Sequence, residues 1–258
     1  MPSPPHIVTL FGLAFSLLLA LGACRPEDAS RVERIEKLRA IGISANPVVL
    51  TAPAPGTSGS IELTAYAALP PGASVSAQSF LDEGSTYNQP VPVVMTPGSE
   101  AMQQMAALDV FSVKATATVG PLTAEQQVIL ATTGKLALRY GIQLDSGEES
   151  EKIVGNILVY PATAQEVTYQ SVGVSVAEPL ANATVSSGPD QVLSGTVTKP
   201  QSENIKVSWF VSSGKVTNRR AKETKWEPEK TGIQTVIMTA RGMKSGSFAL
   251  QAIDVTVE

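Results

Sequence analysis

The chain has 258 residues, of which 43% are hydrophobic and 16% are charged, so it can bury one or two cores and is not an intrinsically disordered protein. Its formal net charge is -4, from 19 Lys and Arg against 23 Asp and Glu. No run of Lys or Arg is dense enough to favour a phosphate backbone, so we expect no nucleic-acid partner.

Residues 1–23 have the composition of a signal peptide. They contain no Lys, Arg, Asp or Glu, and residues 7–23 are apolar apart from Thr9, Ser16 and a few small residues. A membrane-spanning helix needs about 20 apolar residues, so this run is short for a span. We expect a cleaved signal, and the alternative is an uncleaved membrane anchor.

The apolar run ends at the one cysteine of the chain. Leu21, Gly22 and Ala23 place a branched residue and two small residues before Cys24. This pattern resembles the lipobox of bacterial lipoproteins. The resemblance implies cleavage before Cys24, lipidation of the Cys24 sulfur and acylation of the new amino terminus with chains such as palmitate, which hold the protein on its membrane. The alternative is a cleaved secretory signal followed by a free cysteine.

The same resemblance implies a location in the cell. Arg25 stands where Asp often signals retention in the inner membrane of Gram-negative bacteria. We therefore expect a lipid-anchored protein of the cell envelope, in the outer membrane, on its periplasmic or its surface face. The membrane is then one partner, through the lipid on Cys24.

Removal of residues 1–23 also removes His6, the one histidine. With Cys24 lipidated, the mature chain has neither a histidine nor a free thiol. This excludes His-based and Cys-based nucleophilic centres and the usual zinc and haem ligand sets. We expect no catalytic residue, no metal and no cofactor.

Residues 24–35 are charged and include Pro26. Ser30 and Glu33 have the spacing of a capping box, which permits a short helix. The favoured interpretation is a solvated tether with a reach of roughly 17–20 Å, which holds a domain clear of the lipid head groups.

Two segments repeat one pattern. Residues 41–47 (IGISANP) and 172–179 (VGVSVAEP) each place a β-branched residue, Gly, a β-branched residue and Ser ahead of a Pro. An alternating strand follows each segment, and in the first of these strands Ile61, Leu63, Ala65 and Ala67 point to one face. The repeat predicts two tandem domains of one class.

The first domain is expected at residues 36–164. Its opening, LRAIGISANPVVLTAPAPGTSGSIELTAYA, resembles the first immunoglobulin-like repeat of lipoproteins from predatory and social deltaproteobacteria that lack assigned activities. Next we expect an insertion at residues 70–107, a strand at 110–119, and a helix that Thr123 and Gln126 begin and Gly134 ends. A hairpin with its turn at residues 145–151 closes the domain, and residues 162–170 form a linker.

The second domain is expected at residues 165–258. Ile205, Val207, Trp209 and Val211 alternate inward, and turn signals recur about every 8 to 12 residues, which is typical of an antiparallel sandwich. In the last strand the apolar phase changes between Leu250 and Ile253. This change predicts a bulge, or a strand that changes sheets, near Ala252.

Trp209, together with Trp226, Pro228 and Gly232 in a W-x-P-x(3)-G arrangement, resembles the immunoglobulin-like and PKD-like domains of bacterial surface proteins. The resemblance covers about 90 residues and implies the fold alone.

Asp145, Glu148, Glu149 and Glu151 crowd into one predicted turn. Oxygen-rich loops hold Ca²⁺, and facing carboxylates hydrolyse glycosides, but this turn lacks D-x-D-x-D spacing and a cleft. We favour a solvated tip. 

Met102 and Met105, with Met95 nearby, have a spacing that suits Cu(I). Met102, Met105 and Leu108 also form one helical stripe, and we favour a short helix that caps the core.

Ser212 to Lys215 match the S-x-x-K motif of penicillin-recognising enzymes, but they follow an alternating strand and predict a turn. Phe210 is opposite in phase to Trp209, so it is a candidate for an exposed sugar-binding or peptide-binding platform with Trp226 or Tyr169, whereas Phe248 has the phase of a core residue. Partial burial of these aromatic residues is the alternative.

The sequence therefore predicts an all-β protein with two tandem antiparallel immunoglobulin-like β-sandwiches after a cleaved lipoprotein signal. We expect a non-catalytic binding, adhesion or structural module with a protein or glycan partner, and one modified residue, Cys24. The alternative is a carbohydrate-binding or hydrolase-accessory surface protein that uses carboxylates or exposed aromatic residues.

Overall fold

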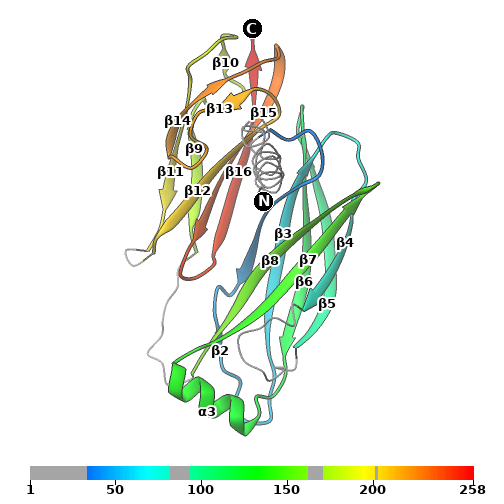
Figure 1. Cartoon of the computed structure of the whole chain (residues 1–258), viewed down its shortest axis with the longest axis vertical. Coiled ribbons are helices and arrows are strands. Elements are labelled where there is room, and N and C mark those ends of the chain that lie inside the picture. The colour runs from blue at the N-terminus through cyan, green and yellow to red at the C-terminus, as the bar shows by residue number, and fades with distance from the viewer. Residues whose placement is uncertain (1–33, 82–92, 162–170, 201–202) are drawn as a thin grey trace, which may run out of the picture.

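The computed structural model describes residues 34–81, 93–161, 171–200 and 203–258. The predicted signal peptide, Cys24, the capping box at Ser30 and the predicted linker at residues 162–170 lie outside the described residues. The described chain forms two immunoglobulin-like β-sandwiches in tandem, as the alternation of the strands predicts (Figure 1).

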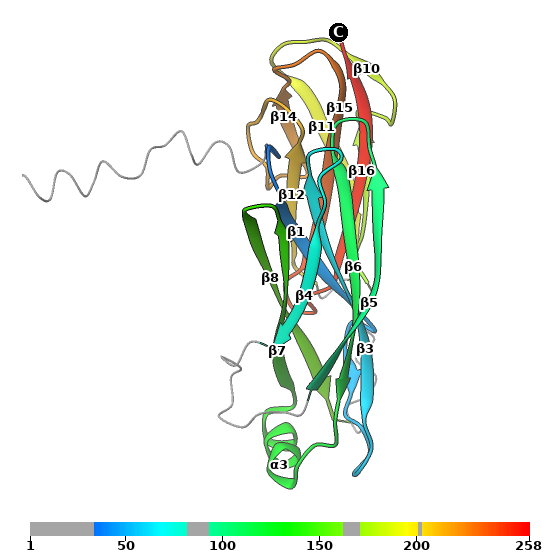
Figure 2. The same ribbon diagram turned by 90° about the vertical axis from the view of Figure 1, so that its right-hand side faces the viewer.

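The first sandwich consists of two four-stranded sheets, with the strand orders β1-β3-β6-β5 and β2-β8-β7-β4. One helix, α3, connects β6 to β7 at the end of the molecule far from the second sandwich (Figure 2). The bounds are β1 Arg39–Asn46, β2 Leu50–Thr51, β3 Gly59–Leu69, β4 Ser76–Leu81, β5 Val93–Gln104, β6 Asp109–Val119, α3 Ala124–Thr133, β7 Leu136–Ser146 and β8 Glu149–Tyr160.

The second sandwich has the strand orders β10-β16-β15-β12 and β13-β14-β11-β9. Its bounds are β9 Gly173–Glu178, β10 Thr184–Val185, β11 Gln191–Thr198, β12 Ile205–Val211, β13 Lys215–Val216, β14 Glu223–Glu227, β15 Gly232–Gly242 and β16 Phe248–Val257.

The sequence repeat is also a repeat of topology. In the first sandwich β1 pairs antiparallel with β3, and after the cis peptide bond Asn46–Pro47 the chain crosses to the other sheet, where β2 pairs parallel with β8. In the second sandwich β9 pairs with β11, and after the cis bond Glu178–Pro179 β10 pairs parallel with β16. Both sandwiches therefore begin with the same arrangement: an antiparallel first strand, a cis proline, and a short strand that pairs parallel with the last strand of the sandwich.

The predicted core positions are confirmed. Ile61, Leu63, Ala65 and Ala67 of β3 are all buried, because alternate residues of a strand face the same side of the sheet. In the second core Trp209 is fully buried, and its indole Nε1–H donates to the carbonyl of Ala221 at 2.8 Å. This bond satisfies the one polar atom of the largest core side chain.

The predicted insertion at residues 70–107 is wrong, because its described part contains two strands of the sandwich. β4 pairs with β7, and β5 pairs with β6 along a ladder that a bulge interrupts between Pro97 and Glu100. β5 lies at a sheet edge with most of its side chains exposed, so it lacks the alternation that a half-buried strand shows.

The predicted helical stripe is wrong for the same reason. Met102 lies in β5 and is exposed, whereas Met105 and Leu108 belong to the turn between β5 and β6. By contrast, the helix α3 is confirmed together with its caps: Thr123 Oγ1 accepts the amide of Gln126, the Gln126 side chain accepts the amide of Thr123, and Gly134 ends the helix at a φ of 74°.

The two sandwiches overlap along the long axis of the molecule and pack side by side (Figures 1 and 2). Side chains on the outer face of the sheet formed by β12, β15 and β16 contact the first sandwich, so residues 234–240 of β15 are all buried. We call this apolar contact the junction. Its buried members are Ile35, Ala68, Leu108, Val110, Phe210 and Ile237, with Ile41, Met105, Leu250 and Ala252 partly buried against them.

The junction also corrects the prediction for the last strand. β15 and β16 pair from Gly232 to Arg241 without a shift of register, so there is no bulge near Ala252. Leu250 and Ala252 face the junction, whereas Ile253 faces the core of the second sandwich. The change of apolar phase arises because both faces of the strand are covered.

Candidate functional site

A cleft opens where the two sandwiches meet, beside the junction. Its volume is about 340 Å³. One wall is formed by β1 and β8, and the other by β12 and the hairpin between β15 and β16. Both sandwiches therefore build it.

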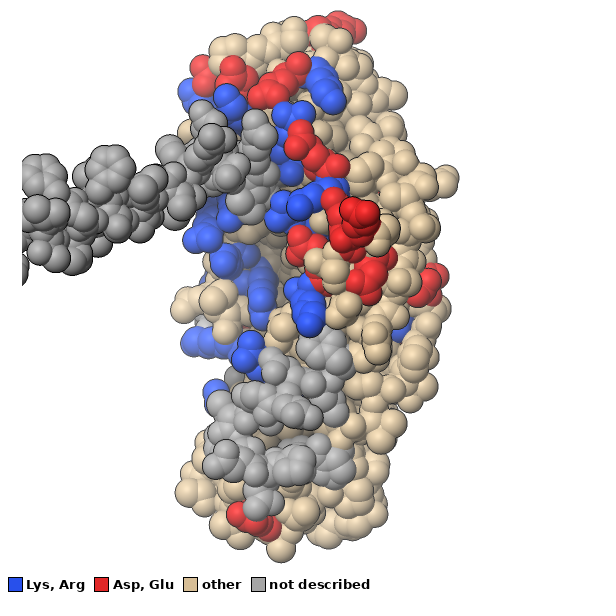
Figure 3. All heavy atoms as spheres, turned by 45° about the vertical axis from the view of Figure 1, so that its right-hand side comes forward, with Lys and Arg blue, Asp and Glu red and all other residues tan. Residues whose placement is uncertain are grey.

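Three cations line this interdomain cleft. Lys206 lies on β12, Arg241 is near the end of β15, and Lys244 lies in the turn that follows. All three side chains are exposed to solvent. Figure 3 shows Lys and Arg side chains over the upper and middle parts of one face of the molecule, with Asp and Glu side chains among them. Clefts lined with charges of one sign concentrate counter-ions, so the cleft favours an acidic group.

Neutral hydrogen-bonding groups complete the lining. Asn156 of β8 contributes an amide from the first sandwich, and Ser208 and Thr239 contribute hydroxyl groups from the second. Asn156 brings both a donor and an acceptor. An oxyanion in the cleft could thus accept hydrogen bonds from both sandwiches at once.

Arg241 connects the cleft electrostatically to the first sandwich. Burial raises the pKa of the Tyr140 hydroxyl above its ordinary value, and the positive charge of Arg241 opposes that rise. The guanidinium group is therefore close enough to act on a buried side chain of the other sandwich.

The turn that carries Lys244 is held by the carboxylate of Glu203. Glu203 is 2% exposed, and it accepts hydrogen bonds from the amides of Lys244 at 2.8 Å and Ser245 at 3.2 Å. Gly242 lies against this group, because a Cβ at Gly242 would approach the Glu203 carboxyl carbon to 2.9 Å. These contacts hold the hairpin in place, and the Glu203 carboxylate is shielded from solvent.

Burial alone would raise the pKa of Glu203, but the hydrogen bonds from Lys244 and Ser245, together with the charge on Lys244, hold its pKa below the ordinary value. Glu203 is therefore ionised at neutral pH, and it offsets part of the positive charge of Lys244. Lys206 and Arg241 carry the rest of the cleft's positive character.

Phe248 is buried, as its core phase in the sequence predicts, but it lies in the wall of the cleft and not in the core of either sandwich. Its ring lies 5.6 Å from the ring of Tyr66, with the two planes inclined by 32°. Gly42 of β1 lies against the Phe248 ring, at a distance that leaves no room for a Cβ. A glycine is needed here because the two sandwiches approach closely.

Hydrogen bonds also join the two sandwiches at the turn between β5 and β6. Thr235 donates to one oxygen of Asp254 at 2.6 Å. The second oxygen of Asp254 accepts the amide of Ala106 at 3.0 Å, and the hydroxyl of Thr235 accepts the amide of Ala107 at 3.2 Å. The turn between β5 and β6 is therefore bound to the outer face of the second sandwich.

The predicted cluster of carboxylates does not form a site. Glu149 accepts the amide of Leu38 at 2.7 Å, and Glu151 lies 4.0 Å from Arg39, while Glu148 is exposed at the turn. Hydrogen bonds from Ser150 and then Gln143 lower the pKa of the half-buried Asp145. Among the described residues no group of three or more His, Cys, Asp or Glu is placed to hold a metal ion.

The aromatic platform that the strand phase suggested is wrong. Phe210 is 7% exposed in the junction, and Trp226 is fully buried. Tyr169 lies outside the described residues. Phe210 and Trp226 are therefore more deeply buried than the alternative of partial burial predicted.

The S-x-x-K motif is a turn, as predicted. Ser212 and Ser213 follow β12, Gly214 has a φ of 87°, and Lys215 begins β13. Met95 and Met105 are partly buried in different clusters, so they do not converge on one ion with Met102.

Sequence reasoning missed Lys206, Arg241 and Lys244. They lie up to 38 positions apart and form no run, so the search for dense basic segments could not detect them. One signal for the junction was available: residues 236–238 (VIM) in β15 are apolar in both phases, which is typical of a strand covered on both faces.

No protein-family model matches the chain, and no curated protein matches its sequence. Solved structures are similar at low identity. The fibronectin(III)-like modules of Clostridium thermocellum CbhA share 11% identity over 84% of this chain and 94% of theirs, with a TM-score of 0.32. The Ig1-2 module of the Drosophila receptor protein tyrosine phosphatase DLAR shares 7% over 86% and 100%, with a TM-score of 0.28. The D00-D0 domain of intimin shares 12% over 83% and 99%, with a TM-score of 0.26.

In the part of the chain that the structure describes, no helix is both long enough and apolar enough to cross a membrane.

Proposed function

We propose that this protein is a lipid-anchored, non-catalytic binding module of a bacterial cell envelope, and that the interdomain cleft holds an acidic group of its ligand. The cleft carries this proposal, because Lys206, Arg241 and Lys244 converge on one hollow of about 340 Å³ that both sandwiches line. The resemblance of Leu21 to Cys24 to a lipobox supports the anchor and the location in the outer membrane. Tandem immunoglobulin-like sandwiches are typical of binding, adhesion and structural modules.

The size and chemistry of the cleft favour a glycan that carries acidic groups. A hollow of about 340 Å³ is at the lower end of the usual range for ligand pockets, so it admits one or two sugar residues and not a folded surface. Carboxylate or sulfate oxygens would accept charge-assisted hydrogen bonds from the Lys and Arg side chains, while the hydroxyl groups and Asn156 would bind sugar hydroxyls.

The sequence also offered a second candidate: a hydrolase-accessory or carbohydrate-binding protein that uses carboxylates or exposed aromatic residues. No arrangement of the described residues supports this candidate. Phe210 and Trp226 are buried, and the carboxylates at residues 145–151 are divided between Leu38, Arg39 and their own hairpin.

The proposal is tested by titrating the full-length protein with a galacturonic acid disaccharide and with a neutral galactose disaccharide. We expect the acidic sugar alone to bind, and its affinity to fall with added salt because exposed charges are screened. In the variant Lys206→Gln/Lys244→Gln the Kd should rise at least tenfold. The matched control is Lys114→Gln/Lys135→Gln, which removes the same charge from the first sandwich, away from the cleft. Equal binding by the two variants, or equal binding of the two sugars, would contradict the proposal.

A further inference from the structure

The described chain begins beside the junction and not at an end of the molecule. Arg34 forms a parallel bridge with Val211, and the amide of Ile35 donates to the carbonyl of Val211 at 3.0 Å. The Ile35 side chain is 3% exposed. These two residues, which the sequence assigned to a solvated tether, therefore pack against the free edge of β12 before the chain enters the first sandwich.

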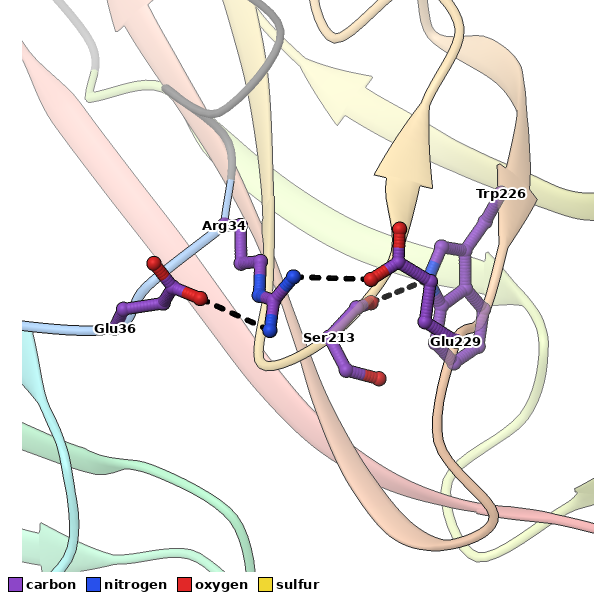
Figure 4. A network of polar contacts seen from close by, with 5 residues as sticks. All are labelled: Arg34, Glu36, Ser213, Trp226 and Glu229. Atoms are coloured by element: carbon purple, nitrogen blue, oxygen red, sulfur yellow. Dashed lines mark hydrogen bonds and ion pairs between the residues drawn. The ribbon is translucent and has the colours of Figure 1, made fainter. Parts of the chain in front are cut away.

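Ion pairs fix this point of attachment. The guanidinium of Arg34 lies between Glu36 and Glu229, at 2.9 Å from each carboxylate (Figure 4). The Trp226 indole donates to the carbonyl of Ser213 at 2.9 Å, which holds the turn after β12 against β14, the strand that precedes Glu229. The attachment point is thus held to the second sandwich by backbone and side-chain contacts.

The length of the preceding chain limits how the molecule can sit on a membrane. Only residues 25–33 separate Cys24 from Arg34, and a chain of that length spans roughly 33–36 Å when fully extended and about 16–19 Å on average. The long strands of one sandwich are about 36 Å from end to end. An upright molecule would need a fully stretched tether, whereas a molecule lying on its side would need no stretching.

A basic loop lies next to the attachment point. The amide of Trp209 donates to the carbonyl of Arg219 at 2.9 Å, on the same free edge of β12 and two residues before Val211. Arg220 and Lys222 are exposed in that loop. Arg34 balances one of the two carboxylates of Glu36 and Glu229, so this group keeps one net negative charge. The three cations of the loop outnumber that charge.

We infer that this surface, the basic edge formed by Arg219, Arg220 and Lys222 beside Arg34, rests on the anionic head groups of the membrane that holds the anchor, so that both sandwiches lie along the bilayer. The inference rests on the proposed lipid anchor at Cys24. The partner of this basic edge is a phospholipid surface of negative charge, because the short tether keeps the edge close to the membrane. Electrostatic attraction then acts over roughly one Debye length, about 8–10 Å.

The test is neutron reflectometry of the full-length lipidated protein on supported bilayers of phosphatidylcholine with phosphatidylglycerol. We expect a protein layer no thicker than one sandwich is wide. The variant Arg219→Glu/Arg220→Glu should give a thicker layer on this bilayer, while Lys114→Glu/Lys135→Glu, which reverses two charges elsewhere, should give the layer of the unmodified protein. Thermal unfolding checks that both variants are folded.

Two results would overturn the inference. The first is a layer as thick as the molecule is long, and the second is the same thickness for both charge-reversed variants. The anchor is measured separately, as protein retained after a wash with concentrated salt, and Cys24→Ala should be washed away. If the unmodified protein is washed away too, the proposed anchor fails together with this inference, whereas retained but upright protein overturns the orientation alone.

Discussion

Among single residues, Glu203 holds the turn that forms part of one wall of the cleft. Its buried carboxylate accepts the amides of Lys244 and Ser245, which belong to the turn between β15 and β16. Its backbone carbonyl accepts a hydrogen bond from the ammonium group of Lys199 at 2.6 Å. One side chain therefore joins the segment before β12 to the hairpin that carries a cleft cation, and the charge state of that side chain matters.

The pKa of Glu203 is lower in the folded protein than its ordinary value, so its ionisation stabilises the fold above that value, and this contribution is lost as the pH falls through the folded-state pKa. We predict that Glu203→Gln lowers the free energy of unfolding by about 1–3 kcal/mol at pH 7, because a neutral amide cannot accept both amides equally well. The difference from the unmodified protein should shrink in acid. Urea unfolding between pH 3 and 7 measures this, with the exposed Glu100→Gln as the control, and a difference that stays constant with pH would contradict it.

Among the elements, those with regular patterns were predictable and the edge strands were not. α3 follows from the spacing of Thr123, Gln126 and Gly134, since each cap satisfies backbone groups that the helix leaves unpaired. β3 and β12 follow from alternation, because one face of each meets a core. β5 has no such face over most of its length, so its residues resembled an insertion until the pairing with β6 placed them.

The cap of α3 offers a direct test at this scale. Thr123→Ala removes the hydroxyl that accepts the Gln126 amide at 3.2 Å, so we predict that the free energy of unfolding falls by about 1 kcal/mol. Thr123→Ser keeps the oxygen and should lose much less. Urea denaturation measures both, and equal losses would show that the methyl group, not the hydrogen bond, stabilises the helix.

At the scale of the whole molecule, the cleft exists because the two sandwiches are docked. Sequence alternation assigned Phe210 to the solvent side of β12, and relative to the second core that assignment is correct. A local pattern reports two faces of a strand but not what covers the second face. Here Ile35, ahead of the first sandwich, and Leu108 and Val110, within it, cover that face. The apolar run in β15 indicated that both faces of this strand are covered. Contacts between residues so distant in the sequence leave no periodic signal, so neither the residues that cover the second face nor the cations of the cleft could be predicted.

The docking of the two sandwiches is tested most directly by the distance between them. Spin labels at Val128→Cys on α3 and Ile233→Cys on β15 replace exposed side chains in separate sandwiches. The labels are introduced in a Cys24→Ala background, so that no other thiol competes. Double electron–electron resonance on this protein should give a single narrow distance distribution, as narrow as that of two labels within one sandwich. A broad or multiple distribution would show that the sandwiches move independently and that no fixed cleft exists between them.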